Sequence, residues 1–240
     1  MMDANYLISI LLSIPGVFLA LAVHECAHGW MSYKLGDPTA KNLGRLTLNP
    51  VKHIDPIGLI CMVLFHFGWA KPVPVNARYY KKPRRDMALV AAAGPISNIL
   101  MSLIGVLLLH IVYLLYSFSP DAIPFGVLWV TALFETPLDM ELGGKLMYLL
   151  FVFLQQFSIL NVSLAVFNLI PVPPLAGSRI AYIFLPTKVY FGLMRYERYI
   201  MMGLFVLIAV GALNGFLGNL SLNLFNGIVN LVRLIPIFRF

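Results

Sequence analysis

The sequence predicts an all-α polytopic membrane protein with about five transmembrane helices, a re-entrant or interfacial segment and a small membrane-associated β-sheet. Its 240 residues are 60% hydrophobic and only 11% charged, and the mean hydropathy is +0.86. A soluble domain of this length has too little interior to bury so much apolar surface. Several apolar runs also reach the roughly 20 residues that a helix needs to cross about 30 Å of hydrocarbon.

Five stretches are candidate membrane spans, within a single domain that we expect to cover residues 1–240. The clearest are residues 6–33, 87–116, 146–169 and 200–217, and residues 219–236 form a fifth, weaker candidate. The first stretch has no basic amino-terminal region, and its apolar part is longer than that of a secretory signal. We therefore expect it to be retained as a helix.

Basic residues are distributed unevenly between these spans. Ten of the 17 lysines and arginines lie between residues 34 and 85, four lie between the third and fourth spans, and residues 117–144 contain none. Because short basic loops tend to stay cytoplasmic, the pattern predicts a multi-pass cell-membrane protein with its amino terminus outside. The net charge of +7 then indicates topology and contact with anionic lipid headgroups, and nucleic acid is disfavoured as a partner.

Residues 40–80 are too polar for a plain span and too apolar for an ordinary cytosolic loop. The stretches "RLTLNPV" and "KPVPVNARYY" alternate partly, as short strands do, and "DPIGLICMVLFHFGW" lies between them. This middle piece has the length of a re-entrant or interfacial segment, not of a full crossing. An amphipathic hairpin resting on lipid is the alternative.

The motif "HECAHG" lies toward the cytoplasmic end of the first span. His24 and His28 are four residues apart, so a helix places both imidazoles on one face, where they can bind one zinc ion. Glu25 can then take a proton from the zinc-bound water, which attacks a peptide carbonyl. Ionisable groups at membrane depth are costly and usually functional, although a chance match or a metal or proton pathway of a transporter remains open.

A catalytic zinc site usually has three protein ligands, and the third span offers no acid to complete this one. It carries instead "NLIPVPPLAG", in which three prolines cannot continue a regular helix. Irregular backbone at membrane depth needs a cavity or protein neighbours, so this break is expected to lie beside a site. Asn168 opens the motif, and a helix cap or an interhelical hydrogen bond would explain it without catalysis.

The chain resembles the site-2 proteases, in particular their small bacterial members without a PDZ domain. The resemblance rests on "HECAHG", "LGDPTAKNLGRLTLNPVKHIDPIG", "FGWAKPVPVNARYYKKPRRDMALVAAAGPISNIL" and "FNLIPVPPLAGSRI", in that order. It implies a zinc metalloprotease of the bacterial inner membrane that cuts transmembrane protein or peptide substrates near the cytoplasmic side. It also implies that Asn168 stabilises the tetrahedral intermediate, and that the strands of residues 40–80 form a sheet that clamps an unwound substrate.

The departure from the family pattern is Ala176, because the family has an aspartate there as the third zinc ligand. A methyl group cannot bind zinc, so this copy is expected to be inactive or impaired and to hold zinc weakly or not at all. The alanine is either engineered, or natural in an inactive homologue that binds membrane helices as an adaptor. A replacement ligand, Asp55 or His53, is the third explanation, although both also fit turn chemistry around the prolines.

Two further sets of amides lie in apolar stretches. Asn98 in "AAAGPISNIL" is interpreted first as a helix-packing residue and second as a substrate contact. The carboxyl-terminal asparagines are spaced four, three and four residues apart, which places Asn219, Asn223, Asn226 and Asn230 on one helical face. Lipid-headgroup contact, helix packing, a substrate entrance and a subunit contact are all compatible with that face, so the oligomeric state stays open.

Overall fold

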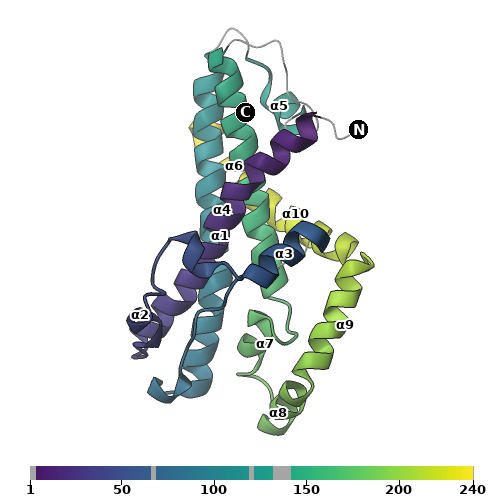
Figure 1. The fold of residues 1–240 in the computed structure, drawn as a ribbon. Helices are drawn as coiled ribbons and strands as arrows, with labels where there is room; N and C mark the ends of the chain where they lie inside the picture. The colour runs from purple at the N-terminus through teal and green to yellow at the C-terminus, as the bar shows by residue number, and fades with distance from the viewer. Residues whose placement is uncertain (1–3, 66–68, 119–121, 132–141, 240) are drawn as a thin grey trace.

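The computed structural model describes residues 4–65, 69–118, 122–131 and 142–239. Three long helices form its frame: α1 (Ala4–Lys34), α4 (Pro83–Tyr116) and α6 (Leu142–Asn168) (Figure 1). Helix α4 packs against both α1 and α6 along the bundle. Within the described residues, three helices are long and apolar enough to cross a membrane, over Ile10–Lys34, Pro83–Tyr116 and Leu142–Asn168. They correspond to the first three predicted spans.

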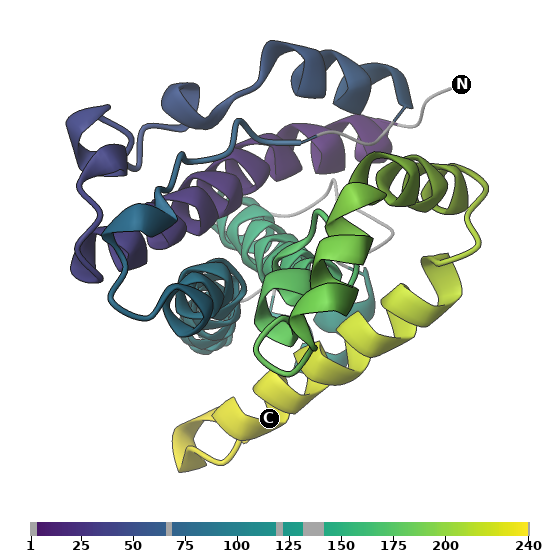
Figure 2. The same cartoon turned by 90° about the horizontal axis from the view of Figure 1, so that it is seen from below.

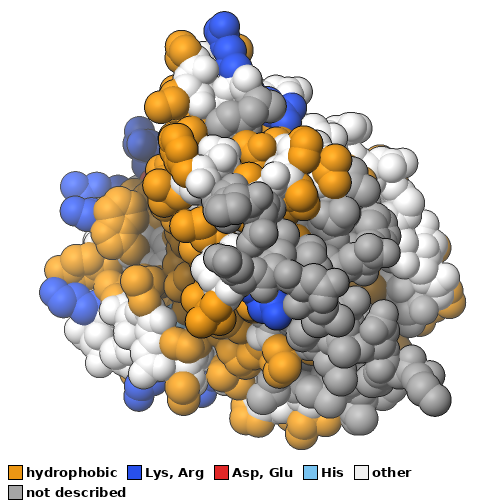
Figure 3. All heavy atoms as spheres, turned by 90° about the horizontal axis from the view of Figure 1, so that it is seen from above, with side chains coloured by type: hydrophobic (Ala, Val, Ile, Leu, Met, Phe, Trp, Pro, Cys, Tyr) orange, Lys and Arg blue, Asp and Glu red, His pale blue; other side chains and the backbone are white. Residues whose placement is uncertain are grey.

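The surface of these helices is apolar where it faces away from the bundle. On α4, Leu100, Leu108 and Leu115 are each about half exposed, at 53%, 45% and 54%. The view from the end opposite α2 and α7 shows hydrophobic side chains over much of the described surface, with lysines and arginines mainly toward its edges (Figure 3). Such a surface suits contact with lipid, because in water it would leave a large apolar area exposed.

The prediction of five membrane spans is wrong for the described residues. The stretch 200–217 divides between α9 (Glu197–Ala209) and α10 (Asn214–Val232), and Gly211 between them has a φ of 72°. A left-handed residue separates the two helices. Helix α9 is too short for a full crossing, and α10 is long enough but not apolar enough. Helix α10 lies obliquely across the bundle and packs on α4 and α6 (Figure 2).

The two faces of helix α10 differ in polarity. Phe225, Val229 and Val232 are buried with Val106 of α4 and Val162 of α6 in one apolar cluster. The four carboxyl-terminal asparagines all lie on the exposed side; these are Asn219, Asn223, Asn226 and Asn230. Packing against the bundle is therefore not their role, and the buried apolar face explains why the helix lies where it does.

The predicted β-sheet is also not formed in the described part of residues 40–80. This segment contains α2 (Thr39–Asn42), the 3-10 turns η1 (Pro50–His53) and η2 (Ala77–Tyr79), and α3 (Pro56–Phe65). The only strand-like pairing there is one isolated antiparallel bridge between Ile54 and Ala70. Prolines explain the failure, because Pro72 and Pro74 occupy alternate positions and have no N–H to donate to a ladder.

Shorter helices complete the described chain. Helix α5 (Phe125–Thr131) packs over the ends of α4 and α6, where Phe125 and Leu128 join an apolar cluster with Phe151. After α6 the chain forms α7 (Ala176–Ala181) and α8 (Thr187–Arg195), and η3 (Pro236–Phe238) follows α10. Helices α7 and α8 lie at the same end of the bundle as α2 (Figure 1). The prolines around position 173 thus end the third span, as the sequence predicts.

Candidate metal centre and active site

Helix α1 brings His24 and His28 together as the sequence predicts. Their Nε2 atoms lie 3.0 Å apart, and the two rings meet edge to face. Helix α4 holds the opposite side of each ring: the Val90 carbonyl oxygen lies 2.7 Å from His28 Nδ1, and Asn98 Oδ1 is hydrogen-bonded to His24 Nδ1. Because a carbonyl oxygen only accepts, His28 carries its proton on Nδ1 and leaves the Nε2 lone pair for a ligand.

Gly94 of α4 keeps the space beside the two Nε2 atoms open. A Cβ at this position would lie 2.5 Å from His28 Nε2 and 2.6 Å from His24 Nε2. Two converging imidazole nitrogens, supported from behind and facing a gap without a side chain, supply two of the three protein ligands that a catalytic zinc site usually has. The residues present therefore fit zinc, with His24 and His28 as two candidate ligands.

Glu25 is half-buried and held by the backbone of an extended segment. Its Oε2 atom accepts a hydrogen bond of 2.8 Å from Val73 N. The segment around Val73 is itself anchored, because Lys71 N donates to His53 O at 2.8 Å and Arg45 Nη2 donates to Lys71 O at 2.7 Å. The contact orients the carboxylate and occupies one oxygen, so Oε1 remains to exchange a proton.

Asp37 is a site-supporting residue that the sequence reasoning missed. It is fully buried, and its carboxylate accepts hydrogen bonds from Ser32 Oγ (2.8 Å), Thr39 N (2.9 Å) and Asn76 N (2.7 Å). Burial acts to raise the pKa of this carboxyl, but the hydrogen bonds from Thr39, Asn76 and Ser32 outweigh it and hold the pKa below its usual value. The Gly-Asp-Pro-Thr sequence after α1 was a usable signal, since aspartate commonly accepts backbone bonds in such turns.

The break in the third span starts at Asn168. Its side-chain amide donates to Leu164 O, one turn earlier in α6, at 2.9 Å. An amide nitrogen has two hydrogens, so this bond leaves a second one for a ligand. Gly177 is required at the far side of the break, because a Cβ there would overlap the carbonyl oxygens of Leu169 and Ile170.

In the part of the chain that the structure describes, no further carboxylate or imidazole completes a metal site with the histidine pair. Among the described residues, no group of three or more His, Cys, Asp or Glu side chains is placed to hold a metal ion. Ala176 is the first residue of α7, which packs against α4. Asp55 instead caps α3 by accepting from Ile57 N (3.0 Å) and Gly58 N (2.9 Å), and His53 Nε2 bonds to Thr47 O at 2.8 Å. Asp55 and His53, the two candidate replacement ligands, are thus engaged in capping a helix and in holding a loop.

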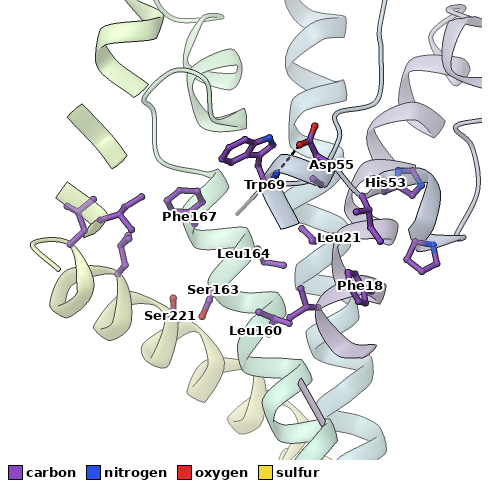
Figure 4. Close-up of a pocket in the computed structure, with 18 of the residues that line it drawn as sticks. Phe18, Leu21, His53, Asp55, Trp69, Leu160, Ser163, Leu164, Phe167 and Ser221 are labelled. Atoms are coloured by element: carbon purple, nitrogen blue, oxygen red, sulfur yellow. Dashed lines mark hydrogen bonds between the residues drawn. The ribbon is translucent and has the colours of Figure 1, made fainter. Parts of the chain in front are cut away.

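A cavity of about 510 Å³ lies between α1, α6 and α10, beneath the bridge of Ile54 and Ala70. Figure 4 shows Phe18 and Leu21 of α1 on one wall, with Leu164 and Phe167 of α6 on another and Trp69 above them. Leu21 precedes Glu25 by one helical turn, and Phe167 precedes Asn168 directly. The cavity is thus lined by residues close in sequence to both predicted catalytic residues, while Glu25 and Asn168 themselves are not part of its lining.

Comparison with known proteins assigns the family. The model of peptidase family M50, the site-2 protease family, matches residues 13–211, so the chain belongs to that family. It is 40% identical over 186 residues to "Putative zinc metalloprotease YwhC" of Bacillus subtilis (strain 168), covering 76% of this chain and 73% of the relative. It is 25% identical over 177 residues to "Putative zinc metalloprotease Rip2" of Mycolicibacterium smegmatis, covering 72% of this chain and 57% of that relative. No solved structure matches the chain.

The family membership makes this chain a membrane protein of a zinc metalloprotease family. It agrees with the helical pair of histidines and with the apolar surface of the three long helices. The predicted roles of Glu25 and Asn168, and the consequence of Ala176, stay predictions.

Proposed function

We propose that this chain has the scaffold of an intramembrane zinc endopeptidase that cuts transmembrane helices near the cytoplasmic side, and that Ala176 leaves this copy impaired. The observation that carries the proposal is the pair of Nε2 atoms 3.0 Å apart, on a helix long enough to span the membrane and next to Glu25. Ionisable side chains at membrane depth are costly, and this cost is explained if the peptide bond to be cut also lies within the membrane.

The chain's own residues would act in distinct ways. When bound, zinc supplies a Lewis acid that polarises the peptide carbonyl and makes water more acidic. Glu25 takes a proton from the attacking water on Oε1 and passes it to the leaving amine, while Val73 N–H holds Oε2. Asn168 donates its second amide hydrogen to the oxygen of the reacting carbonyl.

The cavity suits an unwound apolar stretch of substrate. Its walls are mostly aliphatic and aromatic, and Ser163 and Ser221 supply its few hydroxyl groups (Figure 4). A substrate helix must open before attack, because a regular helix uses its own carbonyls in hydrogen bonds. The cavity between α1, α6 and α10 would receive such a segment from the lipid phase.

The orientation proposed for the chain follows the distribution of basic residues. With the amino terminus outside, α1 ends at Lys34 on the cytoplasmic side, where Arg84 and Arg179 also lie on α4 and α7. The active site then lies toward the cytoplasmic leaflet of a cell membrane crossed several times.

Ala176 specifically favours a second candidate, an inactive homologue that binds membrane helices without cutting them. Restoring the carboxylate by Ala176→Asp and assaying cleavage of a model transmembrane substrate in proteoliposomes separates the two. The protease proposal expects cleavage to appear, and adding Glu25→Gln should reduce it by on the order of 10²–10⁴-fold.

Ala176→Asn is the matched control, because it has nearly the same shape as the restored aspartate but no negative charge. It should bind zinc more weakly and cleave little. If the Ala176→Asp form binds the substrate helix and a full equivalent of zinc but does not cleave, the protease proposal is rejected and the adaptor is favoured.

A further inference from the structure

A chain of buried amides runs from the third long helix to His24. Asn98 of α4 and Asn161 of α6 are both fully buried. Asn98 Nδ2 donates to Asn161 Oδ1 at 2.8 Å, and Asn161 Nδ2 donates to the Phe157 carbonyl oxygen, one turn earlier in α6, at 2.8 Å. The other end of the chain is the bond between Asn98 Oδ1 and His24 Nδ1.

The orientation of the two side-chain amides is fixed by backbone carbonyls, which only accept hydrogen bonds. Because Phe157 O can only accept, Asn161 must present its NH₂ group there and its oxygen to Asn98. Asn98 must then present its own NH₂ group to Asn161, and the carbonyl oxygen of Ala20, 3.4 Å from Asn98 Nδ2, requires the same orientation. The oxygen of Asn98 is thereby turned toward His24.

This polarity determines the tautomer of His24. An amide oxygen accepts only, so His24 Nδ1 must carry the ring proton and Nε2 must carry the lone pair. The lone pair then points to the gap that Gly94 leaves open. His28 Nε2, 3.0 Å away, presents its own lone pair there, so the two acceptors face each other unless a cation binds both. Reversing either amide would set two acceptors or two donors against each other in a dry interior, which is costly.

We propose that Asn98 and Asn161 are positioning residues that fix the tautomer and ring orientation of His24 for metal binding. The inference rests on the zinc site of the proposed function but concerns the chain's own hydrogen bonds. Asn161 acts only through Asn98 and His24, since it lies on α6 and bonds to neither histidine. Outer partners of this kind typically change metal affinity by about 10–100-fold.

The first test needs no variant. The protein has five histidines, so ¹⁵N-histidine labelling and a long-range ¹H–¹⁵N correlation spectrum of the metal-free chain in detergent can resolve the His24 ring. Protonated and bare ring nitrogens resonate far apart. We expect His24 with a protonated Nδ1 and a bare Nε2, and the opposite tautomer would overturn the proposal.

The second test measures zinc affinity by competition with a chelator, in the chain as it stands and in the Ala176→Asp form. Asn161→Leu keeps the branched shape and the number of side-chain heavy atoms but removes both hydrogen bonds, and it should weaken zinc binding about 10–100-fold. Ser158→Ala is the matched control. Ser158 is as buried on α6 as Asn161, and its hydroxyl donates to Leu154 O within the same helix, at 2.7 Å. This control should keep the parent affinity.

A merely structural role for Asn161 predicts a different result. In that case Asn161→Leu would have a lower thermal stability, but the His24 tautomer and the zinc affinity would stay at parent values. That outcome would reject the positioning role of Asn161. Failure of the Ala176→Asp form to cleave would reject the proposed protease activity but would not alter either readout used here.

Discussion

At the scale of single residues, the candidate metal centre depends on two histidines and equally on the absence of a side chain at position 94. His24 and His28 supply the nitrogens, and Gly94 supplies the room between them and α4. Val90 and Asn98 accept from the far side of the two rings, so both imidazoles present Nε2 to the same gap. Any side chain at position 94 would compete with the metal ion for that gap.

Gly94→Ala, made in the Ala176→Asp background, should abolish stoichiometric zinc binding while the helices remain folded. The added Cβ would lie 2.5–2.6 Å from the two ring nitrogens, which are held in place from behind. Metal analysis after dialysis, together with thermal unfolding in detergent, measures both quantities. A full equivalent of zinc in this variant would contradict the site.

Gly203→Ala is the control for the general effect of replacing a helical glycine. Gly203 lies in α9, and nothing lies within 4 Å of a Cβ built there. This variant should keep its zinc and gain about 0.5–1 kcal/mol of stability, because alanine loses less backbone entropy than glycine in a helix.

At the scale of elements, Asp37 joins three pieces of chain that the sequence separates. Its carboxylate accepts from Ser32 at the end of α1, from Thr39 at the start of α2, and from Asn76 in the extended segment before η2. Tyr80 adds a hydrogen bond of 2.7 Å to Ser32. Because the same segment holds Glu25 through Val73, this connection supports the predicted general base from a distance.

The stability of the protein should therefore depend on the ionisation of Asp37. Its folded pKa lies below the value of about 3.9 expected in the unfolded chain, so its contribution is complete above that pH. The contribution is lost as the pH falls through the lower, folded pKa. Asp37→Asn should lower the free energy of unfolding by about 1–3 kcal/mol at neutral pH, because an amide cannot accept all of these bonds.

Thermal unfolding followed by tryptophan fluorescence, from about pH 7 down to about pH 3, checks the sign. The parent should lose stability at the acid end, and the difference between parent and Asp37→Asn should shrink there. A difference of the same size at every pH would show that Asp37 acts by shape alone.

At the scale of the whole molecule, three long helices make the frame and the shorter helices are arranged around it. Helix α10 is held by its apolar face against α4 and α6, which leaves the four asparagines on the outside. The site lies between α1 and α4, and the cavity opens between α1, α6 and α10. The frame thus places metal ligands and cavity on adjoining faces of one helix.

The proposed orientation can be tested by thiol labelling. The background carries Cys26→Ser and Cys61→Ser, which removes both free cysteines. Two separate variants then place one exposed thiol each: Lys82→Cys at the start of α4 and Ser117→Cys at its end. A membrane-impermeant maleimide added to intact cells should modify Ser117→Cys, and Lys82→Cys only after the membranes are opened. Labelling of Lys82→Cys in intact cells would reverse the orientation.

The sequence predicted local features better than pairings between distant segments. The first three spans, the convergence of His24 and His28, and the proline break after Asn168 all follow from helical periodicity and backbone chemistry within one segment. The β-sheet and the fourth and fifth spans were wrong. The alternation near residues 46 and 73 was outweighed by prolines that lack a donor, and one left-handed glycine divided an apolar run that looked continuous.

The sequence by itself determined that this is a helical membrane protein with two histidines spaced for zinc and a nearby carboxylate, because spacing along one helix decides which side chains share a face. It also has alanine at position 176, where the resemblance to the family implies a metal ligand. Only the tertiary structure decided that Val73 holds Glu25, that Asp37 joins three segments, and that Asn161 reaches His24 through Asn98. Those contacts join residues 39 to 74 positions apart, and their partners are selected by packing between helices, which no local pattern records.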